Sequence, residues 1–80
     1  MLLIEFTIEP FVEGNPGPHV TSAVAAAEAL GVTIEFGPFG SSCKVPAAIA
    51  GDVARVIVQA AFAHGATHVS LHTERLQVES

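Results

Sequence analysis

The first side chains that could do chemistry are acidic and hydroxyl groups that alternate with apolar residues near the start of the chain. The polar members are Glu5, Thr7 and Glu9, and the apolar members between them are Ile4, Phe6 and Ile8. A period of two is typical of a half-buried β-strand with one face on a core. The other face would carry two carboxylates beside a hydroxyl, a surface that favours a cationic ligand.

Two histidines near the end of the chain raise the question of a metal site. His68 and His72 alternate with the apolar Val69 and Leu71 and are therefore also expected on a strand. At about 3.3 Å per residue, the two rings would lie about 13 Å apart, too far to share one ion. A metal site would need ligands from another strand or subunit, so we predict no metal site.

No catalytic motif accompanies these groups. The sequence has no nucleophile elbow, phosphate-binding loop or metal-spaced cluster, although Glu5 with His68 or His72 is a minor acid–base alternative. Cys43 has no paired histidine or helix N-terminus evident beside it, so it is expected to be a small strand residue rather than a nucleophile. We predict no catalytic residue, no cofactor and no enzymatic activity.

Helical spacing of apolar residues predicts two helices. The first covers about residues 19–30 and ends at Gly31, which suits the left-handed C-terminal position. The second begins near Pro46, which suits a first helical turn, and ends at Gly65. A break or late start at Gly51 is the alternative for this second helix.

Alternation predicts three further strands, over residues 32–37, 41–45 and 67–78. The segment 37–40 is expected to be a turn, because it combines a proline with flanking glycines. Phe36 alternates with Glu35 in the predicted 32–37 strand, so we expect Phe36 to lie in the core.

The element order of strand, helix, strand, strand, helix, strand predicts one ferredoxin-like domain over residues 1–80, an α+β fold. Right-handed crossovers would place both helices on one face of an antiparallel four-stranded sheet, with the first strand between the third and fourth. The other face should carry the polar partners of each alternation. These are Glu5, Thr7, Glu9, Glu35, His68, Ser70, His72, Glu74 and part of 41–44.

Composition excludes several classes of partner. Eight acidic residues against three basic ones give a formal charge of −5, and no basic cluster exists to bind nucleic acid or an anionic membrane. No apolar run approaches the roughly 20 residues of a bilayer helix, and the start lacks the pattern of a signal peptide, so we expect a cytoplasmic protein. A mean hydropathy of +0.53 in 80 residues suggests that another subunit covers some apolar surface.

Three segments together resemble a known family. They are residues 4–10, Ile-Glu-Phe-Thr-Ile-Glu-Pro; residues 35–41, Glu-Phe-Gly-Pro-Phe-Gly-Ser; and residues 63–70, Ala-His-Gly-Ala-Thr-His-Val-Ser. Their order and spacing resemble the thiamine-binding protein family of YkoF-like, ferredoxin-like domains over nearly the whole chain. The resemblance implies a cytoplasmic, non-enzymatic binder of thiamine or its hydroxymethylpyrimidine moiety, for sequestration or salvage, assembled as a homodimer or homotetramer. One departure is Lys44, which stands where the family often has an acid and could weaken recognition of a cation.

The resemblance also implies which residues would hold thiamine, a ligand with a thiazolium charge and an aminopyrimidine ring. Carboxylates could accept from the exocyclic amine or attract the thiazolium, hydroxyls could complete the hydrogen bonds, and Phe39 or Phe11 could lie against a ring. The candidate ligand-binding residues are Glu5, Thr7, Glu35, Phe39, Ser41 and Ser42. Because Lys44 and Arg75 are the only cations expected near this face, unphosphorylated ligands are favoured.

Simpler interpretations remain open for the same residues. Glu5 and Glu9 could only solvate an open sheet face, or pair with Lys44 or Arg75 across strands. Ser41 could only satisfy backbone groups beside the turn. The alternative function is a small oligomerising or regulatory interaction module with no small-molecule ligand.

Overall fold

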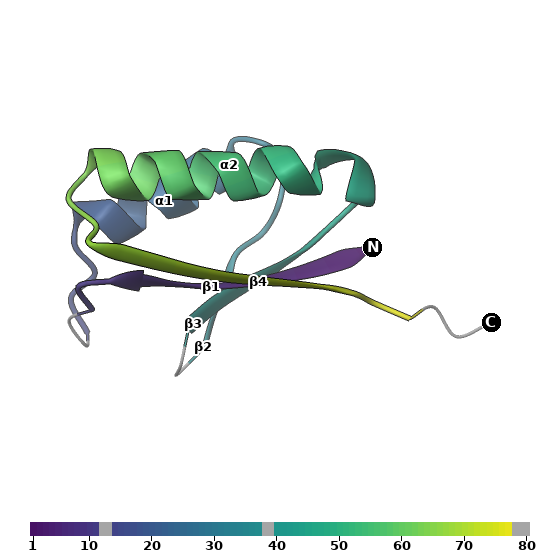
Figure 1. The fold of residues 1–80 in the computed structure, drawn as a ribbon, viewed down its shortest axis with the longest axis horizontal. Coiled ribbons are helices and arrows are strands. Elements are labelled where there is room, and N and C mark those ends of the chain that lie inside the picture. The colour runs from purple at the N-terminus through teal and green to yellow at the C-terminus, as the bar shows by residue number, and fades with distance from the viewer. Residues whose placement is uncertain (12–13, 38–39, 78–80) are drawn as a thin grey trace.

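The computed structural model describes residues 1–11, 14–37 and 40–77, which form four strands and two helices (Figure 1). The elements are β1 (Leu2–Glu9), α1 (Pro18–Glu28), β2 (Glu35–Gly37), β3 (Gly40–Val45), α2 (Ala47–Ala63) and β4 (His68–Arg75). This order confirms the predicted α+β, ferredoxin-like arrangement. No helix in these residues is long and apolar enough to cross a membrane.

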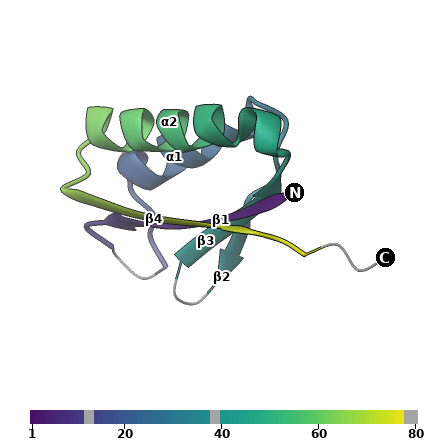
Figure 2. The same cartoon turned by 45° about the vertical axis from the view of Figure 1, so that its right-hand side comes forward.

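The strands form one antiparallel sheet in the order β2-β3-β1-β4. The first strand therefore lies between the third and the fourth, as predicted. Both helices lie against the same face of the sheet, and no helix or strand of the described residues covers the opposite face (Figures 1 and 2). We call these two surfaces the helix face and the open face.

The core lies between the helix face and the two helices. Ile4, Phe6 and Ile8 of β1 are at most 5% exposed, and Val53 and Ile57 of α2 are fully buried. Burial of each such side chain contributes about 1.5–3 kcal/mol relative to an exposed one. The predicted alternation from Ile4 to Glu9 is confirmed, because the three apolar residues of this segment are buried and its three polar residues are exposed.

The prediction that Phe36 belongs to the core is wrong, since its side chain is 67% exposed. Phe36 does point to the helix face, because it pairs with Ser41, which pairs in turn with the buried Phe6. However, β2 is an edge strand, and the β2–β3 hairpin leads away from the helix layer (Figures 1 and 2). The helices therefore do not reach Phe36.

Other element boundaries differ slightly from prediction. The β2 strand is shorter than predicted, because it begins at Glu35 instead of residue 32. Val32 and Ile34 are nevertheless buried in the segment that precedes it. The α2 helix continues through Gly51 without a break. The β4 strand ends at Arg75, and Pro38 and Phe39 of the predicted turn lie outside the described residues.

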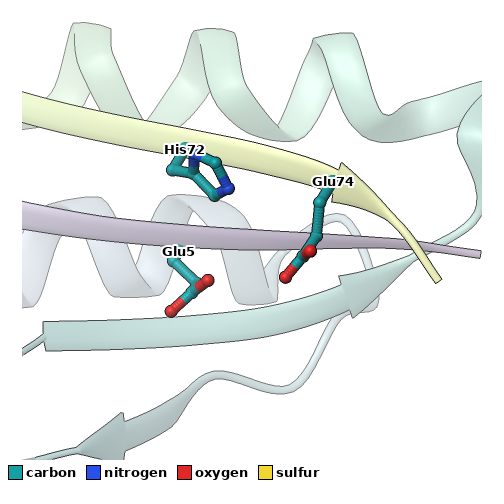
Figure 3. Close-up of side chains that lie close together, drawn as sticks. All are labelled: Glu5, His72 and Glu74. Atoms are coloured by element: carbon teal, nitrogen blue, oxygen red, sulfur yellow. The ribbon is translucent and has the colours of Figure 1, made fainter.

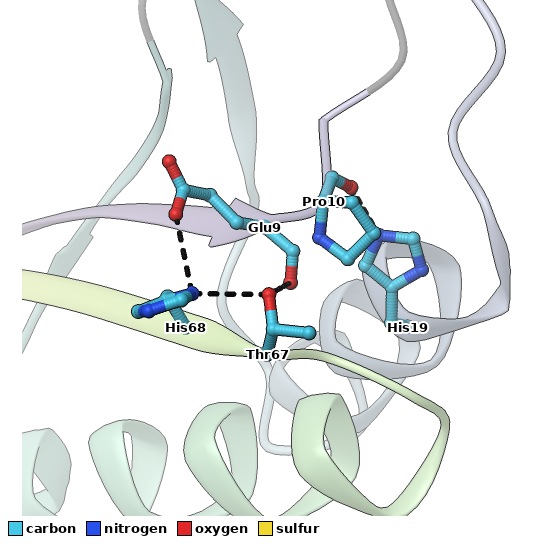
Figure 4. Close-up of polar contacts among 5 residues, drawn as sticks. All are labelled: Glu9, Pro10, His19, Thr67 and His68. Carbon is cyan, nitrogen blue, oxygen red and sulfur yellow. Dashed lines mark hydrogen bonds and ion pairs between the residues drawn. The ribbon is translucent and has the colours of Figure 1, made fainter.

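One buried polar residue was not anticipated. His19 in α1 is only 9% exposed, and its Nε2 lies 2.5 Å from the carbonyl oxygen of Pro10 (Figure 4). A Cβ on Gly17 would lie 2.7 Å from Cε1 of His19, so the absence of a side chain at Gly17 makes room for the ring. The histidine thus ties the start of α1 to the end of β1.

Candidate functional site

The strand register places four polar residues in one row across the open face. Glu35 of β2 lies opposite Ser42 of β3, Ser42 lies opposite Glu5 of β1, and Glu5 lies opposite His72 of β4. Residues directly opposite one another share a face and have Cβ atoms about 4.5–5.5 Å apart. The row therefore holds two carboxylates separated by a hydroxyl, with an imidazole at one end.

Neighbouring rows extend this surface. Thr7 of β1 lies opposite Ser70 of β4 and is two residues from Glu5, so this pair forms the next row on the open face. On the other side, Leu3 separates Lys44 of β3 from Glu74 of β4. Lys44 is thus a cation of the open face, whereas Arg75 pairs with Leu2 and belongs to the helix face, contrary to the expectation that Arg75 lies near the open face.

The Glu5 row and the Thr7 row line a hollow of about 510 Å³. We call it the carboxylate hollow, and its polar lining residues are Glu5, Thr7, Glu35, Ser41, Ser42, Ser70 and His72. Gly40 keeps one part of it open, because a Cβ at Gly40 would lie 2.9 Å from Cγ2 of Thr7. A hollow of this size and composition can accept a small polar or cationic molecule.

Most of the predicted ligand-binding residues come together here. Glu5, Thr7, Glu35 and Ser42 share the open face, as their alternation required. Ser41 lines the same hollow, but its pairing with Phe6 directs its side chain to the helix face. Phe39 lies outside the described residues.

Two lining residues, Ser70 and His72, were expected on the open face but were not proposed as ligand-binding residues. The alternation in β4 was sufficient to predict that both side chains lie on the open face. It could not predict the pairing of β4 with β1, which places His72 opposite Glu5.

A second, more apolar hollow of about 550 Å³ is lined by residues of β1, α1, β2 and β3 and of the segment that joins β1 to α1. Its lining includes Phe6, Ile8, Phe11, Val20 and Phe36. Phe11 and Phe36 are 71% and 67% exposed, so both rings are free to contact another molecule. We call this the apolar hollow. The residues that line both hollows are Phe6, Thr7, Phe36, Gly37, Gly40 and Ser41.

The two predicted surface carboxylates of β1 have different surroundings. Oε2 of Glu9 lies 3.5 Å from Nδ1 of His68, and the backbone oxygen of Glu9 accepts hydrogen bonds from Thr67 (Figure 4). Neither carboxylate pairs with Lys44 or Arg75 in the described part of the chain. Glu5 thus remains available for a ligand.

Cys43 has the structural role expected of it. It is 2% exposed and lies opposite Ile4, inside the core. Burial raises the pKa of this thiol above the ordinary value of 9.0. The protonated thiol is a poor nucleophile, so Cys43 packs rather than reacts.

No protein-family model matches the sequence, and no curated protein sequence matches it either. Two examples illustrate the solved structures to which the chain is similar. A domain of unknown function, DUF77, from Bacillus cereus has 20% identity and a TM-score of 0.64, covering 91% of this chain and 71% of that chain. The hypothetical protein MJ1052 from Methanocaldococcus jannaschii has 15% identity and a TM-score of 0.62, covering 98% and 84%.

The chain shares the fold of these proteins. At such low identities the likeness concerns the backbone arrangement alone, and it supports the ferredoxin-like prediction. The first is a domain of unknown function and the second a hypothetical protein, so neither suggests a function for this chain. The thiamine-binding assignment therefore stays a prediction from the sequence.

Proposed function

We propose that this domain binds thiamine or its hydroxymethylpyrimidine moiety without turnover, for sequestration or salvage. The observation that carries the proposal is the row in which Ser42 separates Glu5 from Glu35 within the carboxylate hollow. Two inter-strand spacings of about 4.8 Å separate the backbones of these two glutamates. One bound molecule with two polar ends can therefore engage both carboxylates.

The chemistry of thiamine matches this arrangement. Its exocyclic amine can donate to one carboxylate, while the thiazolium ring carries a positive charge that the other carboxylate attracts. Ser42 offers a hydroxyl between the two carboxylates, and Thr7 offers another in the neighbouring row. Lys44 lies in the next row, beyond Leu3, and is not among the residues lining the hollow. This position reduces the penalty that its charge would impose on a cationic ligand.

Phe36 offers an aromatic contact of the kind expected from Phe39. Phe36 lines both hollows and is 67% exposed. A ligand that extends past Gly40 would meet this ring and could stack on it.

Isothermal titration of thiamine, hydroxymethylpyrimidine and thiamine phosphate into the purified protein tests the proposal. A charge-assisted hydrogen bond contributes about 1.5–3 kcal/mol, so Glu5→Gln and Glu35→Gln should each weaken thiamine binding by about tenfold or more. Glu28→Gln is the matched control, because Glu28 is an exposed glutamate on α1, in the helix layer. Equal affinity of folded Glu5→Gln and wild-type protein would remove Glu5 from the site.

The alternative is an oligomerising module with no small-molecule ligand, which the exposed rings of Phe11 and Phe36 favour. It predicts no heat from any of the three compounds, together with a dimer or tetramer in sedimentation. Phe36→Ser should then dissociate the oligomer. In the thiamine-binding proposal, saturable heat is expected whatever the oligomeric state.

A further inference from the structure

Three exposed side chains on β1 and β4 bring metal-binding atoms together on the open face. The carboxylate oxygens of Glu5 and Glu74 and a ring nitrogen of His72 all lie within 4.8 Å of one another. Figure 3 shows the three side chains over the same part of the sheet. One nitrogen and two carboxylate donors form a familiar kind of ligand set for a divalent transition metal.

The antiparallel register produces this cluster. His72 lies directly opposite Glu5, and Glu74 lies opposite Leu3, so Glu74 is the diagonal neighbour of Glu5. Direct and diagonal cross-strand neighbours on one face are within reach of long side chains. No metal site was expected from the sequence, because His68 and His72 are too far apart on one strand to share an ion. A metal site at His72 requires a ligand from another strand, and Glu5 of β1 provides it.

These three side chains make no other polar contact in residues 1–11, 14–37 and 40–77. Two carboxylates and a neutral imidazole would carry a charge of about −2, which a divalent cation offsets. The imidazole favours zinc and similar metals over magnesium and calcium, which prefer oxygen ligands. Water can complete the coordination at this exposed position.

We propose that Glu5, His72 and Glu74 bind a divalent transition metal of the zinc type. Metal–ligand bonds of about 2.0–2.2 Å place any two donor atoms no more than about 4.4 Å apart, slightly less than the 4.8 Å within which these three atoms lie. The side chains are exposed, so rotation about their own bonds can bring the donors together without moving the strands.

Glu9 and His68 provide a natural comparison on the same two strands. They lie directly opposite each other, like Glu5 and His72, and they make an ion-pair contact. They belong to no group of three possible ligands in the described part of the chain. A site that needs three donors should therefore form at the Glu5 pair and not at the Glu9 pair.

The test is titration of zinc chloride into the metal-free protein, followed by calorimetry. We expect one site per chain, and an affinity at least about tenfold weaker in His72→Gln and in Glu74→Gln. His68→Gln is the matched control and should bind zinc as the wild type does. Cobalt(II) gives a second readout, since its visible absorption bands should appear in the wild type and in His68→Gln but be lost from His72→Gln.

Absence of saturable zinc binding, or equal weakening by His68→Gln and His72→Gln, would overturn the proposal. The metal site does not depend on thiamine binding, although both use Glu5. Glu74→Gln removes a metal ligand alone and Glu35→Gln a proposed thiamine contact alone. Failure of one proposal is therefore distinguishable from failure of the other.

Discussion

Gly40 of β3 lies so close to Thr7 of β1 that a Cβ on the glycine would be 2.9 Å from Cγ2 of Thr7 and 3.0 Å from the backbone oxygen of Phe6. The second contact is with backbone, which cannot move aside as a side chain can. The glycine therefore allows β1 and β3 to approach closely beside the carboxylate hollow.

Gly40→Ala should lower the free energy of unfolding by about 1–3 kcal/mol, because the added methyl group forces the two strands apart. Urea denaturation followed by circular dichroism measures this change. Gly51→Ala is the matched control, since Gly51 lies inside α2 with no atom within 4 Å of an added Cβ. That substitution should raise stability by about 0.5–1 kcal/mol. A Gly40→Ala variant as stable as the wild type would contradict the close approach.

Phe6 and Phe36, which both lie opposite Ser41, should differ in their contributions to stability. Phe6→Ala removes a 3% exposed ring and should cost about 3–5 kcal/mol. Phe36→Ala removes a 67% exposed ring and should cost less than about 1 kcal/mol. Thermal or urea denaturation of both variants checks the comparison. Similar losses would mean that Phe36 is covered in solution, as the oligomerising alternative requires.

His19→Ala should destabilise the fold by about 1–3 kcal/mol, because it leaves the carbonyl oxygen of Pro10 without its side-chain partner. His64→Ala is a useful comparison. Nδ1 of His64 lies 2.9 Å from the carbonyl oxygen of Ala60, but this contact is exposed to water. Water can replace the imidazole there, so the loss should stay within about 0.5 kcal/mol. Equal losses in chemical denaturation would show that burial of His19 adds nothing.

The buried Cys43 thiol should make stability depend on alkaline pH. Burial raises its pKa in the folded state, so the unfolded thiol ionises first as pH rises. The contribution of this thiol to the free energy of unfolding is therefore fully present below the ordinary thiol pKa. It is lost as the pH rises through the pKa of the folded state.

Wild-type unfolding free energy should therefore fall more steeply than that of Cys43→Ala between about pH 8 and pH 10, with an excess of up to about 1.4 kcal/mol per pH unit. Urea denaturation across this range measures both slopes. Parallel slopes would indicate that the thiol titrates equally in both states.

Local patterns in the sequence were sufficient to predict the elements and the faces of the strands. The alternation from Ile4 to Glu9 has the period of a strand, and it correctly separated the buried residues of β1 from the exposed ones. The element order then limited the topology to a few arrangements, because short connections and right-handed crossovers exclude most others. The open face and its carboxylates follow from these two steps.

Only the tertiary structure decided which residues lie opposite one another and which part of the sheet the helices cover. The position of His72 opposite Glu5 depends on pairing between strands at opposite ends of the chain, and neither local pattern contains that register. Phe36 has the alternation of a core residue, yet it is exposed because its strand forms the sheet edge beyond the helices. Periodicity specifies the side of the sheet, whereas burial and cross-strand neighbours depend on packing between distant segments.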